Sequence, residues 1–402
     1  MEWKEYKFSN IGKIVTGKTP RTAISDNYGG KIPFLSPSDD MQTKYVPITA
    51  RCLTEKGLSE VKNCLIPSNS ICVSCIGSDM GKSVITKEPI VTNQQINSII
   101  PSNEFDSNFI YYVMQSKRKE IRFMGGNGTA VPILNKTAFS NLTFFAPSLF
   151  DQRRIASILS SLDDKIAINR RICENLEAQA QALFKHWFID FAPFKNGKFV
   201  ESELGMIPEG WRVGRLGELG EVVGGATPSK ANDSYYTQKG IAWLTPKDLS
   251  NKLMKFTSRG EIDITQEGYD SCSAKLMPKG SVLFSSRAPI GYLTIAKNEI
   301  CTNQGFKSVV PKYAGTAYIY YLLKNNTKRI ESMASGTTFK EASGSLMKSL
   351  SVVVPPKRII DEYEASVAEM FNEQEVIEQE SSRLSALRDT LLPKLMSREI
   401  KV

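Results

Sequence analysis

The chain has 402 residues, 41% hydrophobic and 23% charged, a composition typical of a globular protein with two or more domains. No run of about 18 apolar residues is present, which argues against a membrane-spanning helix, and the polar N-terminus lacks a signal-peptide core, so a cytoplasmic location is expected. The net charge of +9 favours a polyanionic partner such as nucleic acid, the alternative being a merely basic surface.

The cysteine and histidine content argues against a metal or redox centre. Seven cysteines are scattered along the chain, and their odd number fits reduced thiols. Cys72 and Cys75 form a C-x-x-C, but they lie in an apolar run that indicates a strand, and a zinc site would need further ligands nearby. The single histidine, His186, is more than 100 residues away, so no metal site is predicted.

Residues 1–147 form the first predicted domain. Short apolar runs alternate here with Gly, Pro, Asn and Ser, a pattern typical of short strands joined by long loops. One helix is expected at 107–123. The adjacent carboxylates Asp39 and Asp40 have no clear acid–base setting.

A long helix is predicted at 148–191. Its seam residues alternate in spacing between four and three, the heptad pattern of a helix that packs lengthwise on another: Ile155, Leu159, Leu162, Ile166, Asn169, Cys173, Leu176, Ala180, Leu183 and Trp187. Asp163 and Asp164 lie on this helix and are expected to be solvated. A helix of this length needs a partner, and the remainder of the chain contains one.

The chain is an internal repeat with an offset of 208 to 211 residues. Trp3 recurs as Trp211, and the Thr-Asn-Gln that ends at Gln94 recurs as the one that ends at Gln304. The repeat predicts a linker, a second domain, its short helix and a second long helix, at 192–210, 211–355, 316–333 and 356–402.

The second long helix keeps the seam, with polar residues at a few positions. The seam polar residues Asn169 and Gln374 either fix the helix register or lie at solvated edges. Pro393 is expected to break or kink the second helix near its end. The predicted fold is α+β: two tandem strand-rich domains, each followed by a long helix, with the helices paired as an antiparallel coiled coil about a pseudo-twofold axis. Such a pair, with two unequal domains and a basic charge, suits an asymmetric, bipartite DNA target.

Three motifs resemble the specificity subunits of type I restriction–modification enzymes, and the resemblance covers essentially the whole chain. They are Leu204-Gly-Met-Ile-Pro-Glu-Gly-Trp211, the Pro-Ser-Leu-Phe-Asp-Gln-Arg-Arg-Ile stretch at 147–155, and Leu183-Phe-Lys-His-Trp-Phe-Ile-Asp-Phe191. The first copy departs from the family pattern because Trp3 lacks the preceding Pro-Glu-Gly. The resemblance implies that the strand-rich domains recognise double-stranded DNA and that the paired helices form the spacer.

The same resemblance implies the partners and the chemistry. Two methyltransferase subunits are expected to dock on the helices, bind S-adenosylmethionine and methylate adenine N6, and motor–nuclease subunits complete the restriction enzyme. The chain itself is expected to bind no cofactor and to catalyse nothing alone. The residues agree, because no Asn/Asp-Pro-Pro-Tyr/Phe sequence for amino-methyl transfer is present.

Candidate DNA contacts lie in matched polar loops, where hydroxyls, amides and basic groups suit phosphates or base edges. They are Lys18, Thr19, Arg21, Ser36, Ser38, Asn93, Gln94, Asn127, Thr129, Thr227, Ser229, Lys230, Thr245, Lys247, Arg287, Asn303, Gln304, Thr337, Thr338 and Lys340. Ordinary tight turns are the alternative for the Gly-Lys-Thr-Pro and Gly-Ala-Thr-Pro loops. Because the Asn-Gln pair recurs in both copies, a scaffold or phosphate role is favoured over base recognition.

The ends of the long helices carry the candidate partner surface. The aromatic surface at the end of the first helix is larger than one partner helix would cover, which predicts a face for the partner subunits. The predicted residues are Leu183, Phe184, Trp187, Phe188, Leu391 and Leu392. The rival interpretation of the whole chain is a non-catalytic scaffold whose two domains bind proteins or glycans.

Overall fold

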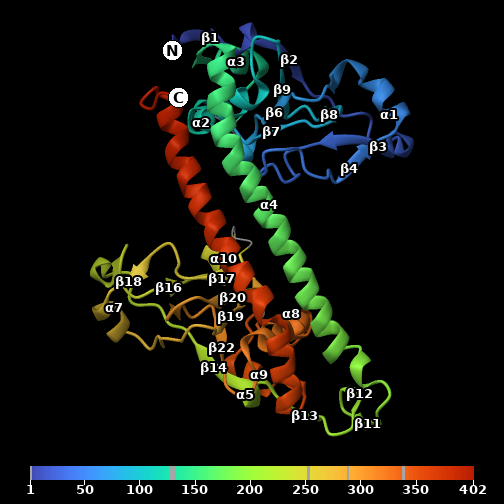
Figure 1. The fold of residues 1–402 in the computed structure, drawn as a ribbon, viewed down its shortest axis with the longest axis vertical. Coiled ribbons are helices and arrows are strands. Elements are labelled where there is room, and N and C mark those ends of the chain that lie inside the picture. Colours follow the sequence, from blue (N-terminus) through green and yellow to red (C-terminus); the bar gives the residue numbers. More distant parts are fainter. Residues whose placement is uncertain (1, 126–132, 251–253, 288, 337–339) are drawn as a thin grey trace. The chain divides into compact units, whose positions relative to one another are not determined.

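The computed structural model describes residues 2–125, 133–250, 254–287, 289–336 and 340–402. Contacts divide the chain into two compact units: unit 1 is Met1–Ile168 with Ser381–Val402, and unit 2 is Asn169–Glu380. Both units contain part of each long helix, α4 (Leu149–Phe188) and α10 (Lys357–Met396) (Figure 1). Each unit therefore combines a strand-rich domain with two helical segments that are far apart in sequence.

Unit 1 contains a two-stranded β1-β10 pair, a four-stranded sheet of order β2-β9-β6-β7 and a second of order β4-β3-β8-β5. Its strands are β1 (Lys4–Lys7), β2 (Gly12–Thr16), β3 (Tyr28–Leu35), β4 (Arg51–Leu53), β5 (Leu65–Ile66), β6 (Ile71–Ser74), β7 (Ser83–Ile85), β8 (Ile90–Thr92), β9 (Ile96–Pro101) and β10 (Thr143–Ala146). Its shorter helices are α1 (Glu55–Glu60), α2 (Ser107–Gly125) and α3 (Lys136–Asn141). Helix α2 covers the helix expected at 107–123.

Unit 2 repeats this plan and adds a hairpin in the linker. Its main sheet has the order β14-β22-β19-β20-β17. Its strands are β11 (Phe199–Ser202), β12 (Gly205–Pro208), β13 (Arg212–Arg215), β14 (Gly220–Gly224), β15 (Tyr236–Thr237), β16 (Trp243–Leu244), β17 (Phe256–Thr257), β18 (Asp263–Ile264), β19 (Val282–Ser286), β20 (Ile290–Ala296), β21 (Cys301–Thr302), β22 (Lys307–Pro311) and β23 (Ser351–Val354). Its shorter helices are α5 (Leu216–Leu219), α6 (Pro246–Leu249), α7 (Gln266–Asp270), α8 (Thr316–Met333) and α9 (Gly344–Ser349).

The repeat holds at the level of single hydrogen bonds. The pair β1-β10 corresponds to β13-β23, and the order β2-β9-β6-β7 corresponds to β14-β22-β19-β20. Helix α1 is capped by Thr54, whose hydroxyl accepts from the amide of Gly57 at 3.1 Å, and α7 is capped in the same way by Thr265 and Gly268 at 3.1 Å. The two domains are therefore one scaffold with different surface side chains.

The seam prediction for the long helices is confirmed. None of the seam residues predicted in the first helix is exposed, nor is any of their counterparts 208 residues later in the second helix. In unit 1, Ile155 and Leu159 near the start of α4 share a core with Leu395 near the end of α10. In unit 2, the ring of Phe188 near the end of α4 lies 5.1 Å from that of Tyr363 near the start of α10. Each unit thus contains an antiparallel helix pair.

The polar seam residues are buried, so the solvated-edge interpretation is wrong. Asn169 is fully buried, and its side-chain amide donates to Glu380 at 2.7 Å. Gln374 is 4% exposed. A role for these residues in fixing helix register remains a prediction.

The expected break at Pro393 is also wrong, because α10 continues to Met396, whereas a kink at this residue stays a prediction. The exposed ring of Pro393 is flanked by Leu391, Leu392 and Leu395, which pack against the unit 1 core. Loss of one backbone hydrogen bond and the ring clash cost about 3 kcal/mol in a helix interior. We attribute the continuous helix to the packing of these leucines, which offsets that cost.

Candidate nucleic-acid interface

In unit 1 the loop after β2 is held by its backbone against the loop before β9. The amide of Lys18 donates to the carbonyl of Thr92 at 2.9 Å. A Cβ added at Gly17 would lie 2.2 Å from the carbonyl oxygen of Asn93, so a larger residue would push the two loops apart.

Side chains complete this attachment. The hydroxyl of Thr19 donates to Oε1 of Gln94 at 2.6 Å, and the hydroxyl of Tyr28 donates to the carbonyl of Pro20 at 2.8 Å. The loop is therefore braced on both sides of the Thr-Pro step.

Unit 2 repeats the backbone attachment at equivalent residues. The amide of Ala226 donates to the carbonyl of Thr302 at 2.9 Å. A Cβ at Gly225 would lie 2.1 Å from the carbonyl oxygen of Asn303.

The side-chain braces recur as well. Thr227 donates to Gln304, and Tyr236 donates to the carbonyl of Pro228 at 2.7 Å. We call Thr19–Gln94 and Thr227–Gln304 the Thr–Gln pairs. The tyrosine braces were not among the predicted residues, although Tyr28 and Tyr236 stand 208 positions apart and the repeat offset could have identified them.

The paired loops leave different groups exposed in the two copies. Lys18 and Arg21 are exposed in unit 1, whereas Ser229 and Lys230 are exposed in unit 2. The guanidinium of Arg21 lies 4.0 Å from Glu60 but is 79% exposed, so its charge remains available to a ligand. A common scaffold thus presents two different sets of donors, as two unlike half-sites require.

The asparagines of the Asn-Gln motifs form turns. Oδ1 of Asn93 accepts from the amide of Gln95 at 3.1 Å, and Oδ1 of Asn303 accepts from the amide of Gly305 at 2.9 Å. This geometry supports the scaffold role favoured for the repeated motif. Gln94 and Gln304 are exposed, and the Thr–Gln pairs use only their side-chain oxygens, so their amide nitrogens keep donor capacity.

Two of the predicted DNA contacts, Ser36 and Thr245, have hydroxyls that take part in local turns. Ser36 is 6% exposed, and its hydroxyl donates to Asp39 at 2.9 Å. Thr245 donates to Asp248 at 2.7 Å and caps α6. Both hydroxyl hydrogens are used in local turns, so neither hydroxyl is free to donate to a base edge.

The exposed residues next to these turns, Ser38 and Lys247, remain candidate DNA contacts. Ser38 is exposed, although its hydroxyl lies 2.7 Å from that of Ser36. Lys247 has an 84% exposed side chain with one weak ion pair, at 3.5 Å to Glu261.

In unit 2 further predicted residues converge on the same loops. The amide of Ser286 donates to the carbonyl of Gly305 at 2.7 Å, which places the adjacent Arg287 beside the Asn-Gln turn. Arg287 lies 3.7 Å from Glu341, next to the exposed Lys340. Four other predicted residues, Asn127, Thr129, Thr337 and Thr338, lie outside the described residues.

Comparison with known proteins identifies the family. The model of the type I restriction modification DNA specificity domain matches residues 1–178 and 208–381. The chain belongs to this family. It is 30% identical to the MjaIX specificity subunit of Methanocaldococcus jannaschii over 100% of this chain and 94% of that protein. It is 24% identical to the HindI specificity subunit of Haemophilus influenzae over 99% of this chain and 100% of that protein.

The fold comparison agrees. The crystal structure of a type I S subunit from M. genitalium superposes with a TM-score of 0.63 at 14% identity, covering 98% of this chain and 96% of that one. As a member of this family the chain is a DNA-target-recognition subunit that works with methylase and restriction subunits, and it is not itself the catalyst. The rival interpretation as a protein- or glycan-binding scaffold is not favoured.

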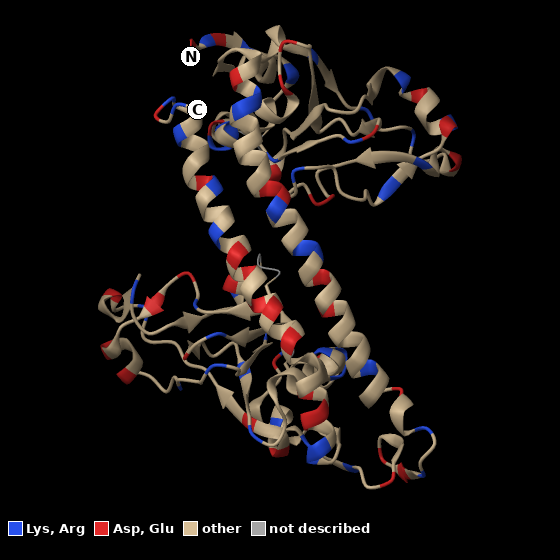
Figure 2. Ribbon diagram, viewed as in Figure 1, with Lys and Arg blue, Asp and Glu red and all other residues tan. Residues whose placement is uncertain are grey.

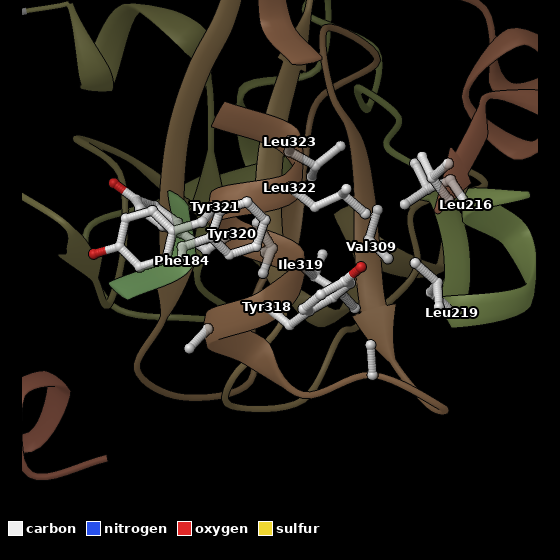
Figure 3. Close-up of a cluster of buried hydrophobic side chains, with 14 of the residues drawn as sticks. Phe184, Leu216, Leu219, Val309, Tyr318, Ile319, Tyr320, Tyr321, Leu322 and Leu323 are labelled. Atoms are coloured by element: carbon white, nitrogen blue, oxygen red, sulfur yellow. The ribbon is translucent and has the colours of Figure 1, made fainter. Parts of the chain in front are cut away.

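The specificity subunit does not use its aromatic helix end as predicted. Phe184 and Phe188 are 2% and 8% exposed, and Leu183 and Trp187 pack against the same core. Phe184 lies among the aromatic residues of α8 (Figure 3), with its ring 5.8 Å from that of Tyr321.

Leu391 and Leu392 near the end of α10 pack on the unit 1 core and are half-buried. Burial contradicts a partner face at Phe184 and Phe188. Leu183, Trp187, Leu391 and Leu392 are half-buried, and their part in a partner face stays a prediction.

Two further expectations concern charged and sulfur groups. Asp163 is 9% exposed and paired with Arg388 at 2.7 Å, which corrects the expectation that it is solvated. Burial raises the pKa of the Cys72 thiol to about 12, and of the Cys75 thiol to about 11, so neither is a ready nucleophile.

Within the described ranges, no group of three or more His, Cys, Asp or Glu side chains is arranged to hold a metal ion. None of the helices in the described part of the chain is both long enough and apolar enough to cross a membrane.

Proposed function

We propose that this subunit recognises an asymmetric, bipartite DNA target, with one half-site bound by each strand-rich domain. The observation that carries the proposal is the pair of equivalent, braced loops that present Lys18 and Arg21 in one copy and Ser229 and Lys230 in the other. An identical scaffold with unlike side chains suits two related surfaces that recognise different sequences. Rigid loops also bind with a smaller entropy loss than mobile loops.

The proposed complex contains two methyltransferase subunits, which bind S-adenosylmethionine and methylate adenine N6, and motor–nuclease subunits that complete restriction. The twofold repeat supports two methyltransferase positions. Because the proposed target is host DNA, we place the subunit in the cytoplasm.

Lys18 and Arg21 are proposed to bind phosphates, because exposed flexible cations beside backbone amides suit that ligand. The test is a salt titration of DNA binding by the subunit in complex with its methyltransferase partners. Lys18→Met should weaken binding to all sequences about equally and reduce the slope of log affinity against log salt concentration by about 0.9. Lys13→Met, which removes an exposed cation from strand β2 of the same unit, is the matched control.

The bipartite target itself is tested by mapping methylated adenines in the host genome. Exchange of residues 1–147 for the corresponding domain of another specificity subunit should change one half-site and leave the other and the spacer unchanged. A change in both half-sites contradicts the proposal. Absence of DNA binding at low salt also contradicts it, and would instead support a scaffold that binds proteins or glycans.

A further inference from the structure

Each domain buries one lysine against the long helices at an equivalent position. Lys44 is 8% exposed and Lys255 is 5% exposed. The carbonyl of Lys44 accepts from the amide of Ile85 in β7 at 2.8 Å, and the carbonyl of Lys255 accepts from the amide of Ile295 in β20 at 2.8 Å. Because β7 and β20 are equivalent strands, these residues, which we call the junction lysines, occupy the same place in the repeat.

A tyrosine stands beside each junction lysine and also recurs. The ammonium of Lys44 lies 5.5 Å from the ring centre of Tyr112, and that of Lys255 lies 4.9 Å from the ring centre of Tyr321. The two tyrosines occupy equivalent positions in α2 and α8, 209 residues apart.

Both tyrosines donate to a carboxylate on α4. The hydroxyl of Tyr112 donates to Asp163 at 2.6 Å, and that of Tyr321 donates to Glu177 at 2.9 Å. The domains therefore keep the same lysine and tyrosine, while the helices supply acids from positions that the repeat does not relate.

The ammonium groups bind the helices differently. In unit 2, Lys255 donates to Glu177 on α4 at 2.7 Å and to Gln374 on α10 at 3.4 Å. Its backbone amide donates to Glu378 on α10 at 2.9 Å. These bonds join the domain to both helices at one point. Acidic residues are frequent on this part of α10 (Figure 2). In unit 1 the ammonium of Lys44 donates to the neutral hydroxyl of Ser160 at 2.7 Å.

Burying an ion pair with this many partners has an unfavourable desolvation free energy, and its benefit is a single, well-defined geometry. Burial lowers the pKa of Lys255 to about 8, a direct sign of that cost, which Glu177 opposes. An apolar contact at this site would satisfy burial without fixing an angle. The lysine recurs at the same place in both copies although its helix partners differ. This recurrence indicates that the lysine fixes the angle between the domain and the helices.

We propose that Lys44 and Lys255 are positioning residues that hold each recognition domain in one orientation on the long helices and thereby set the permitted spacer between the half-sites. The inference rests on the proposed bipartite function. A domain that tilts on its helices accepts half-sites at neighbouring spacings, while its own base contacts are unchanged.

The test uses the complete methyltransferase complex in the host and maps methylated sites by spacer length. Lys255→Met should lower the discrimination against spacers one base pair longer or shorter by about tenfold, the factor for loss of one charged hydrogen bond, with both half-sites unchanged. Lys44→Met should show a smaller effect, because its hydrogen-bond partner on α4, Ser160, is neutral and the nearby acids of α4 act on it only at longer range. Lys279→Met is the matched control, since Lys279 also bonds α10, through Glu375 at 3.4 Å, but is 66% exposed.

The outcomes separate the two ideas. A general stability loss lowers methylation at every site equally and leaves the spacer preference intact, which overturns the inference. If Lys255→Met fails to fold, Glu177→Gln keeps the side-chain size and decides by the same measurement. If wild-type methylation shows no bipartite motif, the proposed function itself fails.

Discussion

The ion pair between Asp163 and Arg388 offers the sharpest test of how unit 1 holds its two helices. One carboxylate oxygen of Asp163 accepts from Arg388 on α10 at 2.7 Å, and the other accepts from Tyr112 on α2 at 2.6 Å. Asp163 therefore joins α2, α4 and α10. Asp163→Asn keeps the shape of the side chain but removes its charge and one acceptor.

The expected cost follows from the burial of the partners. Breaking a fully buried pair costs about 3–5 kcal/mol. Because the side chain of Arg388 is 31% exposed, we expect a lower value, about 2–3 kcal/mol, since water recovers part of the charge interaction. For a unit of this size each kcal/mol lowers the melting temperature by about 2–4 °C, so a decrease of about 4–12 °C is predicted.

Thermal unfolding followed by circular dichroism measures this decrease, and the neighbouring Asp164 supplies the control. Asp164 is exposed on the same helix, so Asp164→Asn should change the unfolding free energy by less than about 0.5 kcal/mol. Equal melting temperatures for the two variants would refute the argument that burial gives Asp163 its role.

Three further predictions concern unit 2. Lys255 has a folded-state pKa of about 8 against an ordinary value of 10.5, so its charged form opposes folding. Wild type should therefore gain stability relative to Lys255→Met as pH rises from 8 to 10.5, by roughly 3 kcal/mol at most in chemical denaturation. Gly225→Ala would place a Cβ 2.1 Å from the Asn303 carbonyl, and should weaken DNA binding in gel shifts without altering helix content. Glu364 accepts from the amide of Tyr318 at 2.8 Å at the start of α8, so Glu364→Ala should cost about 1 kcal/mol of unfolding free energy, measured by denaturant titration.

The architecture was predictable because its signals are linear in the sequence. A heptad seam has a fixed period, and the offset of 208 to 211 residues can be read without knowing any contact. The helix at 107–123 and its copy at 316–333 followed from the same logic.

The fate of individual side chains was not predictable, because it depends on what covers them. The aromatic end of α4 looked like a docking face, yet Phe184 is covered by Tyr321 of α8 and Tyr363 of α10, more than 130 residues later in the chain. Asp163 looked solvated because its partner Arg388 is 225 residues away. Ser36 looked available because the turn made by Asp39 depends on backbone angles, which spacing alone does not give.

The placement of the two acids on α4 limits how the helices can be lengthened. Asp163 and Glu177 are 14 residues apart, which is two heptads, so they occupy the same heptad position on one helix. A seven-residue insertion between them, matched by seven residues in the middle of α10, keeps each acid beside its tyrosine and preserves the seam. It should lengthen the spacer while both half-sites persist in a methylation map. A four-residue insertion in each helix rotates Glu177 by roughly 40° relative to Asp163 on a helix of 3.6 residues per turn, against roughly 20° in the opposite sense for seven residues, and it interrupts the heptad repeat with a stutter. That variant should discriminate less sharply between spacer lengths than the seven-residue variant, and equal discrimination by the two variants would contradict the argument from the acid positions.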